Sequence, residues 1–331
     1  MQNILSNLNS VLPVIAERIK SCLGKFGSNV YEVEYNNGIE AYQTKNYQTA
    51  IKSYKNAIRL NPEKAEVYYN LGLVYFAMNN SDEAELNFRK AIRLNPNDVD
   101  SYYNLGLLLQ KAEKFEEALE QFYATIELSN EDPDNFYSAG LVFADMKKFD
   151  EASVYISKAI EFAPSNPEYV LGLAFVYDKK SEITADSNDI DEAIQAYINA
   201  LNFDPASEDI NYRLAICYAR KGLWDECVNY CKKVLEINGN SSIAYNQYGL
   251  ALFCKEEIDD SIIMFRKAIV IQPDFASAYH NLGNSYEKQG DFKAAVESFN
   301  KYIELSSPDQ KDLSLIKSHI KALEAIMKLK S

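Results

Sequence analysis

Residues 68–96 read YYNLGLVYFAMNNSDEAELNFRKAIRLNP. Apolar residues recur in this stretch at steps of three and four, which is the spacing of one face of an α-helix. Asn80 and Ser81 interrupt the pattern and indicate a turn. Pro96 ends it, because proline lacks a backbone N–H and clashes with the preceding helical turn. The stretch therefore predicts two amphipathic helices joined by a turn.

The same pattern repeats along the whole chain. A small residue at the position of Ala84 recurs at intervals of 34 residues, with one interval of 41. These residues are Ala50, Ala84, Ala118, Ala152, Ala193, Cys227, Ser261 and Ala295. A second small residue precedes each of them, at Gly38, Gly72, Gly106, Gly140, Ala174, Ala215, Gly249 and Gly283. The spacing predicts eight stacked helix pairs, because one pair cannot bury its own apolar face.

The second unit resembles the tetratricopeptide repeat (TPR) almost slot for slot. Its slots hold Tyr68, Leu71, Gly72, Tyr75, Ala84, Phe88, Ala91 and Pro96. The eighth unit departs from the family pattern at Tyr302 and Ser307, which replace a small residue and the final proline. The resemblance covers about residues 31–309. It implies an all-α fold, a right-handed α-solenoid of about eight helix-turn-helix units.

The two ends of the array are predicted to be helical caps, since a solenoid must cover its terminal apolar faces. Residues 1–30 are expected to form an N-terminal capping helix or half-repeat, and residues 310–331 a C-terminal capping helix. Leu313, Ile316, Ile320, Leu323 and Met327 follow the spacing of one buried helical stripe. The same spacing also fits a dimerisation helix, so a homodimer through the terminal helices remains an alternative.

Composition restricts the classes of partner. The chain has 34 basic and 48 acidic residues, a formal net charge of −14 and no Lys/Arg block, so nucleic acid is not an expected partner. No run of 18 apolar residues is present, and the first 25 residues include Glu17, Arg18 and Lys20. These features argue against a membrane-spanning helix and against a signal peptide. They predict a cytoplasmic location.

The sequence offers no pattern for catalysis, a metal or a cofactor. Its two histidines, His280 and His319, lie on different predicted helices without a partner at triad or ligand spacing. Cys227 and Cys231 are four residues apart, but they fill core slots of the sixth unit, and packing is the favoured interpretation over ligation. The chain is therefore predicted not to be an enzyme.

Amides line the first helix of several units at the position before the Leu-Gly slot. They are Asn36, Asn70, Asn104 and Asn281. In the TPR family this slot points into the superhelix, and the line is similar to the asparagine ladder in the TPR arm of O-linked N-acetylglucosamine transferases. An amide can pair bidentately with a peptide unit of an extended chain. The alternative is that these are solvated amides without a ligand.

A second line, of aromatic residues, stands one position earlier. It consists of Tyr35, Tyr69, Tyr103 and Tyr137, and Leu73 and Leu107 follow four residues after two of them on the same helical face. An exposed aromatic and apolar groove normally marks an interaction site. Packing of these residues between adjacent helices is the competing interpretation.

Two further features refine this picture. The slots that hold Lys, Asn and Arg in carboxylate-binding TPR domains here hold Tyr35, Ile39, Asp100 and Asn104, so recognition of a terminal carboxylate is not expected. The seven extra residues of the fifth unit, within residues 179–189, are rich in Ser, Thr, Asp and Asn and predict a longer loop between its helices.

The sequence therefore predicts a non-catalytic scaffold or adaptor that binds an extended segment of a partner protein in its concave groove. A substrate-recruiting subunit for a separate transferase is an alternative raised by the amide line. A structural homo-oligomer built through the terminal helices is another. No cofactor is expected.

Overall fold

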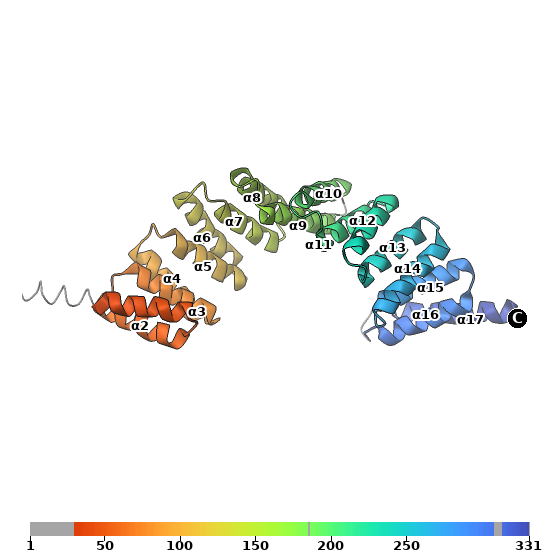
Figure 1. Cartoon of the computed structure of the whole chain (residues 1–331), viewed down its shortest axis with the longest axis horizontal. Coiled ribbons are helices and arrows are strands. Elements are labelled where there is room, and N and C mark those ends of the chain that lie inside the picture. The colour runs from red at the N-terminus through yellow and green to blue at the C-terminus, as the bar shows by residue number, and fades with distance from the viewer. Residues whose placement is uncertain (1–29, 185, 308–312, 331) are drawn as a thin grey trace, which may run out of the picture. The chain divides into compact units, whose positions relative to one another are not determined.

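The computed structural model describes residues 30–184, 186–307 and 313–330, and within these ranges every regular element is an α-helix (Figure 1). A first helix occupies residues 30–43. The helices that follow are α2 (Tyr47–Leu60), α3 (Ala65–Ala77), α4 (Ser81–Leu94), α5 (Val99–Lys111), α6 (Phe115–Leu128), α7 (Pro133–Asp145), α8 (Phe149–Phe162), α9 (Pro167–Thr184), α10 (Ser187–Leu201), α11 (Glu208–Arg220), α12 (Trp224–Ile237), α13 (Ser242–Cys254), α14 (Ile258–Ile271), α15 (Ala276–Gln289), α16 (Phe292–Leu305) and α17 (Leu313–Lys330).

The helices pack as consecutive antiparallel pairs, which confirms the predicted all-α solenoid. They form two compact units, one up to Ala163 and one from Pro164. In the first unit α3 packs on α4, α5 on α6 and α7 on α8, and α2, α4 and α6 also contact α3, α5 and α7, the first helices of the pairs that follow them. The second unit repeats this order from α9 to α17.

A glycine on the first helix of a repeat allows the second helix to approach closely. At Gly72 a Cβ atom would lie 2.6 Å from Cε1 of Phe88, a distance that real Cβ contacts do not reach. Phe88 is fully buried, and Phe299 fills the same place against Gly283. The repeated glycine and aromatic slots in the sequence thus correspond to the crossing point of the two helices.

The turns inside the repeats use residues in the left-handed region. Asn79 has φ 56° and Glu113 has φ 58°, while Gly290 has φ 91° at the corresponding place. Asn80 then caps α4, because its side chain accepts a hydrogen bond from the backbone N–H of Glu83. The turn predicted at Asn80 and Ser81 is confirmed.

The prediction of a long loop in the fifth repeat is wrong. Helix α9 runs for 18 residues, whereas α7 and α11 run for 13, so the extra residues lengthen the first helix of the repeat. Asp178 and Ser181 are buried in this extension. Their polar side chains are stabilised by partners on α10 and α11, which the local sequence does not reveal.

The C-terminal helix packs on the last repeat. Leu313, Ile320 and Leu323 of α17 are buried, and Ile320 and Leu323 join the core around Phe299. Leu329, by contrast, is 88% exposed. The packing supports the proposal that α17 is a cap. The cap predicted for the N-terminus falls on residues 1–29, outside the described residues.

Candidate functional site

The predicted amide and tyrosine lines are joined by hydrogen bonds between neighbouring repeats. Asn70 of α3 donates from Nδ2 to the Tyr35 hydroxyl of the preceding repeat at 2.8 Å. The same Nδ2 donates to the backbone oxygen of Glu66 at 2.9 Å. Because the backbone carbonyl can only accept, this contact fixes which end of the amide carries the nitrogen.

The arrangement recurs one repeat further along. Asn104 of α5 donates from Nδ2 to the Tyr69 hydroxyl at 3.3 Å and to the backbone oxygen of Asp100 at 2.9 Å. In the fourth repeat Ser138 takes the amide position and its hydroxyl donates to the Tyr103 hydroxyl at 3.1 Å. We call Tyr35, Asn70, Tyr69, Asn104, Tyr103 and Ser138 the tyrosine–amide ladder.

The rings of the ladder also pack inside their own repeats. The Tyr69 ring lies 6.1 Å from that of Phe88, and the Tyr103 ring lies 5.8 Å from that of Phe122 in an edge-on arrangement. These tyrosines remain half-buried. Burial, with the charges of Asp100 and Asp98, raises the pKa of Tyr69 to about 12. The rings of Tyr69 and Tyr103 therefore pack within their own repeats while the residues remain partly exposed.

Bidentate pairing of these amides with a ligand is not available in this arrangement. Both N–H hydrogens of Asn70 and of Asn104 are used inside the protein. Each Oδ1 accepts no hydrogen bond from the residues that the structure describes, so it can accept one from a ligand N–H. The ladder thus presents hydrogen-bond acceptors.

The remaining predicted site residues differ in their burial and in the unit to which they belong. Leu73, Leu107 and Tyr137 are half-buried, and Asn36 is exposed on the first helix. Asn281 belongs to the second unit, where its Nδ2 donates to Oδ1 of Asn246 at 3.0 Å. The structure therefore brings the tyrosines and amides of the first four repeats together in one unit, and places Asn281 in the other.

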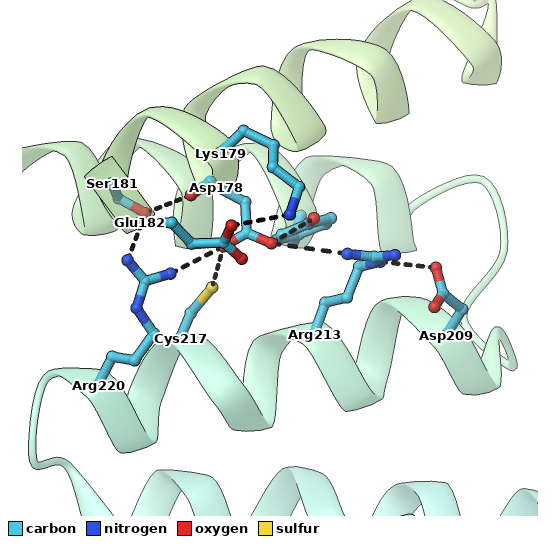
Figure 2. Close-up of polar contacts among 9 residues, drawn as sticks. Asp178, Lys179, Ser181, Glu182, Asp209, Arg213, Cys217 and Arg220 are labelled. Carbon is cyan, nitrogen blue, oxygen red and sulfur yellow. Dashed lines mark hydrogen bonds and ion pairs between the residues drawn. The ribbon is translucent and has the colours of Figure 1, made fainter. Parts of the chain in front are cut away.

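A buried polar cluster in the second unit escaped the sequence interpretation (Figure 2). Asp178 of α9 accepts hydrogen bonds from Arg220 at 3.0 Å, from the Tyr197 hydroxyl at 3.2 Å and from the Cys217 thiol at 3.7 Å. Arg213 lies 3.6 Å from its second oxygen. Arg220 also donates to the Ser181 hydroxyl at 2.9 Å.

This cluster stabilises the packing of three helices and offers no reactive thiol. Burial and the charge of Asp178 raise the pKa of Cys217 to about 12, so the thiol stays protonated and is a poor nucleophile. Burial likewise raises the pKa of Tyr197. The Asp178 carboxylate is held by three donors and one further cation, and these join α9 to α10 and α11. A carboxylate on the core side of a helical pattern is the signal that could have indicated it.

The described residues contain no group of three His, Cys, Asp or Glu side chains that could hold a metal ion. Cys227 and Cys231 are fully buried in the core between α11, α12 and α13, beside Ala215 and Ala251. Their predicted role in packing is confirmed. None of the helices in the described part is long and apolar enough to cross a membrane.

Stacked helix pairs with regularly placed glycine and aromatic contacts define an α-solenoid repeat protein. Models of the tetratricopeptide repeat match residues 65–98, 87–120, 133–166 and 276–307, and a TPR repeat model matches residues 38–79, 183–222 and 249–290. Together they cover more than half of the sequence. The chain belongs to the tetratricopeptide repeat family, whose members generally mediate protein–protein interactions.

Curated relatives match short parts of the chain. Tetratricopeptide repeat protein 37 of Xenopus laevis is 39% identical over 93 residues, 27% of this chain and 6% of the relative. The chloroplastic protein PYG7 of Arabidopsis thaliana is 28% identical over 91 residues, 26% of this chain and 30% of the relative. The peroxisomal targeting signal receptor of Kluyveromyces lactis is 24% identical over 32% of this chain and 19% of the relative. The chain thus spans less than a third of the length of these relatives.

Solved structures share the fold at low identity. A tetratricopeptide repeat protein from Parabacteroides merdae aligns with a TM-score of 0.54 and 17% identity, over 78% of this chain and 99% of that one. PilF of Pseudomonas aeruginosa aligns with a TM-score of 0.51 and 19% identity, over 70% and 99%. At this level of identity the similarity shows the fold alone.

Proposed function

We propose that the protein is a non-catalytic scaffold or adaptor, and that the tyrosine–amide ladder of the first unit binds an extended segment of a partner protein. The observation that carries this proposal is the hydrogen bonding of Asn70 and Asn104. Their Nδ2 groups donate to partners within the protein, while their Oδ1 atoms accept no hydrogen bond from the described residues. Fixed acceptors bind a ligand without losing side-chain freedom, which lowers the entropic cost of binding.

The amides cannot supply the whole affinity. A hydrogen bond contributes roughly 0.5–1.5 kcal/mol net, so two or three amides would give weak binding. The half-buried side chains of Tyr69, Tyr103, Leu73 and Leu107 add apolar surface beside the amides. Tyrosine is a suited anchor because it offers large contact area at a low cost in conformational entropy. The amides would hold the backbone of the segment, and the rings its side chains.

A capture experiment with a matched control tests the proposal. The site variant carries Tyr69→Ala, Asn70→Ala and Asn104→Ala. The control carries Tyr123→Ala, Asn97→Ala and Asn130→Ala, the same residue types at exposed places outside the ladder. Wild type and both variants are used for affinity capture from host lysate at matched helicity by circular dichroism. A partner lost from the site variant alone supports the proposal, and identical captures would rule out the ladder as the interface.

A further inference from the structure

In the first unit, the helix face that carries the tyrosine–amide ladder also carries a row of acidic residues. One stands three positions before each of Tyr35, Tyr69, Tyr103 and Tyr137 of the tyrosine line, at 34-residue intervals. They are Glu32, Glu66, Asp100 and Asp134, and all four are exposed. Residues three and four apart share one face of a helix, so this acidic row runs along the same face as the tyrosines and amides.

Contacts in the structure place the row next to the tyrosines. The Tyr31 hydroxyl donates to Oε1 of Glu66 at 3.1 Å. Burial and then the charge of Glu66 raise the pKa of Tyr35, and Asp100 acts in the same way on Tyr69. Charges that influence the tyrosines in this way would also attract a cation bound against the same rings.

Three members of the row, Glu32, Glu66 and Asp100, are neutralised little by positive charge in the described residues. Glu32 and Asp100 form no ion pair with any residue in the described ranges. Glu66 has one exposed pair, with Lys64 at 3.5 Å, and an exposed pair of this kind contributes little. Lys111 is directed to Asn79 and to the ring of Phe76. The first unit therefore combines acceptor oxygens, negative charge and aromatic rings on one face.

Lys64 illustrates how a lysine fits this chemistry. Its Nζ lies 6.0 Å from the centre of the Tyr31 ring while it faces the Glu66 carboxylate. An ammonium group over an aromatic face and near a carboxylate gains from both interactions. In the second unit Glu168 and Asp209 occupy the next two positions of the row, but Asp209 is paired with Arg213 at 2.9 Å, and the last two positions hold Ile243 and Ser277.

We infer that the segment bound by the first unit is basic: an extended stretch of a partner protein with Lys or Arg side chains directed at Glu32, Glu66, Asp100 and Asp134. Its backbone N–H groups donate to Oδ1 of the ladder amides, and its aliphatic stems lie on the tyrosine rings. This inference rests on the proposed function, because it names the chemistry of the segment that the ladder takes.

The test uses the full chain and three fluorescein-labelled dodecapeptides, of alternating Lys and Ser, Gln and Ser, or Glu and Ser, titrated by fluorescence anisotropy. The row variant carries Glu66→Gln, Asp100→Asn and Asp134→Asn. The control variant carries Glu120→Gln, Glu127→Gln and Glu161→Gln, exposed acids on the second helices of the same unit. Both variants change the net charge by the same amount, which separates the row from general attraction to an acidic protein.

Wild type is expected to bind the Lys peptide and not the Glu peptide. The row variant should bind the Lys peptide about tenfold more weakly at low salt, because three exposed charge contacts are lost, and the control should bind as wild type. Equal losses in both variants, equal binding of the Lys and Gln peptides, or no binding of the Lys peptide would overturn the inference.

The Tyr69, Asn70 and Asn104 alanine variant, titrated alongside, separates this inference from the proposed function. If it loses binding while the row variant does not, the ladder binds peptides and the basic preference is wrong. If no variant differs from wild type with any bound peptide, the ladder itself is not the site, and the proposed function fails with the inference.

Discussion

At the residue scale, one amide does two tasks in the ladder. Asn70 ties its own helix to Tyr35 of the preceding repeat with its N–H groups and leaves Oδ1 for a ligand. The amide is therefore part of the contact between repeats as well as of the proposed binding face. A substitution at this position should affect stability and binding together.

A double-mutant cycle measures the first of these tasks. Asn70→Ala, Tyr35→Phe and the double variant are unfolded in urea, followed by one spectroscopic signal. The hydrogen bond between the two side chains should appear as a coupling energy of about 0.5–1 kcal/mol. Half-buried groups can bond water when the partner is lost, which keeps the value low. A coupling energy of zero would show that the two side chains act independently.

The left-handed turn residues give a second prediction at this scale. Glu113 has φ 58°, a region that costs a residue with a Cβ atom more than it costs glycine. Glu113→Gly should raise the free energy of unfolding by about 0.5–1 kcal/mol, measured in urea. Asn79→Gly is the matched control, since asparagine tolerates this region and should gain less. A loss of stability in Glu113→Gly would contradict the explanation.

At the element scale, helix α9 depends on distant partners. Ser181 lies in the stretch that the sequence alone places in a loop, residues 179–189, and Asp178 directly precedes that stretch. Arg220, which binds both, lies 42 residues after Asp178 in the sequence. The repeat pattern was readable because the small and aromatic residues of a helix pair lie 16 positions apart, as Gly72 and Phe88 do. The lengthened helix α9 could not be predicted from the sequence, because some of the contacts that stabilise it come from Arg220 in the next repeat.

The polar cluster gives the prediction at this scale. Asp178→Ala removes the acceptor shared by Arg220, Tyr197 and Cys217, and should lower the free energy of unfolding by about 2–4 kcal/mol, since it leaves a half-buried cation and two buried donors without their partner. Glu182→Ala is the control: it breaks an exposed pair with Lys179 and should cost less than about 0.5 kcal/mol. Thermal and urea unfolding of both variants provide the comparison. Equal stabilities would show that the cluster does not hold α9 in place.

At the scale of the whole molecule, the repeats in the described residues share one helix-pair arrangement but present different side chains on their first helices. The sequence predicted the repeats, the tyrosine line and the amide line, because each follows the 34-residue spacing. It did not predict that the two lines bond to each other, since that depends on residues 35 positions apart meeting across a helix–helix contact. The proposed binding face is thus formed by the stacked repeats of the first unit and by no single repeat.

Site-specific photo-crosslinking tests the central claim most directly. A benzophenone amino acid replaces Leu107, beside the ladder, and in a second protein it replaces Leu86, which is 58% exposed on the second helix α4. Both proteins are irradiated with the partner obtained by capture, and the crosslinked products are identified by mass spectrometry. Crosslinks from position 107 to one continuous segment of the partner, and none from position 86, are the predicted result. Crosslinks from position 86 alone would contradict binding at the ladder.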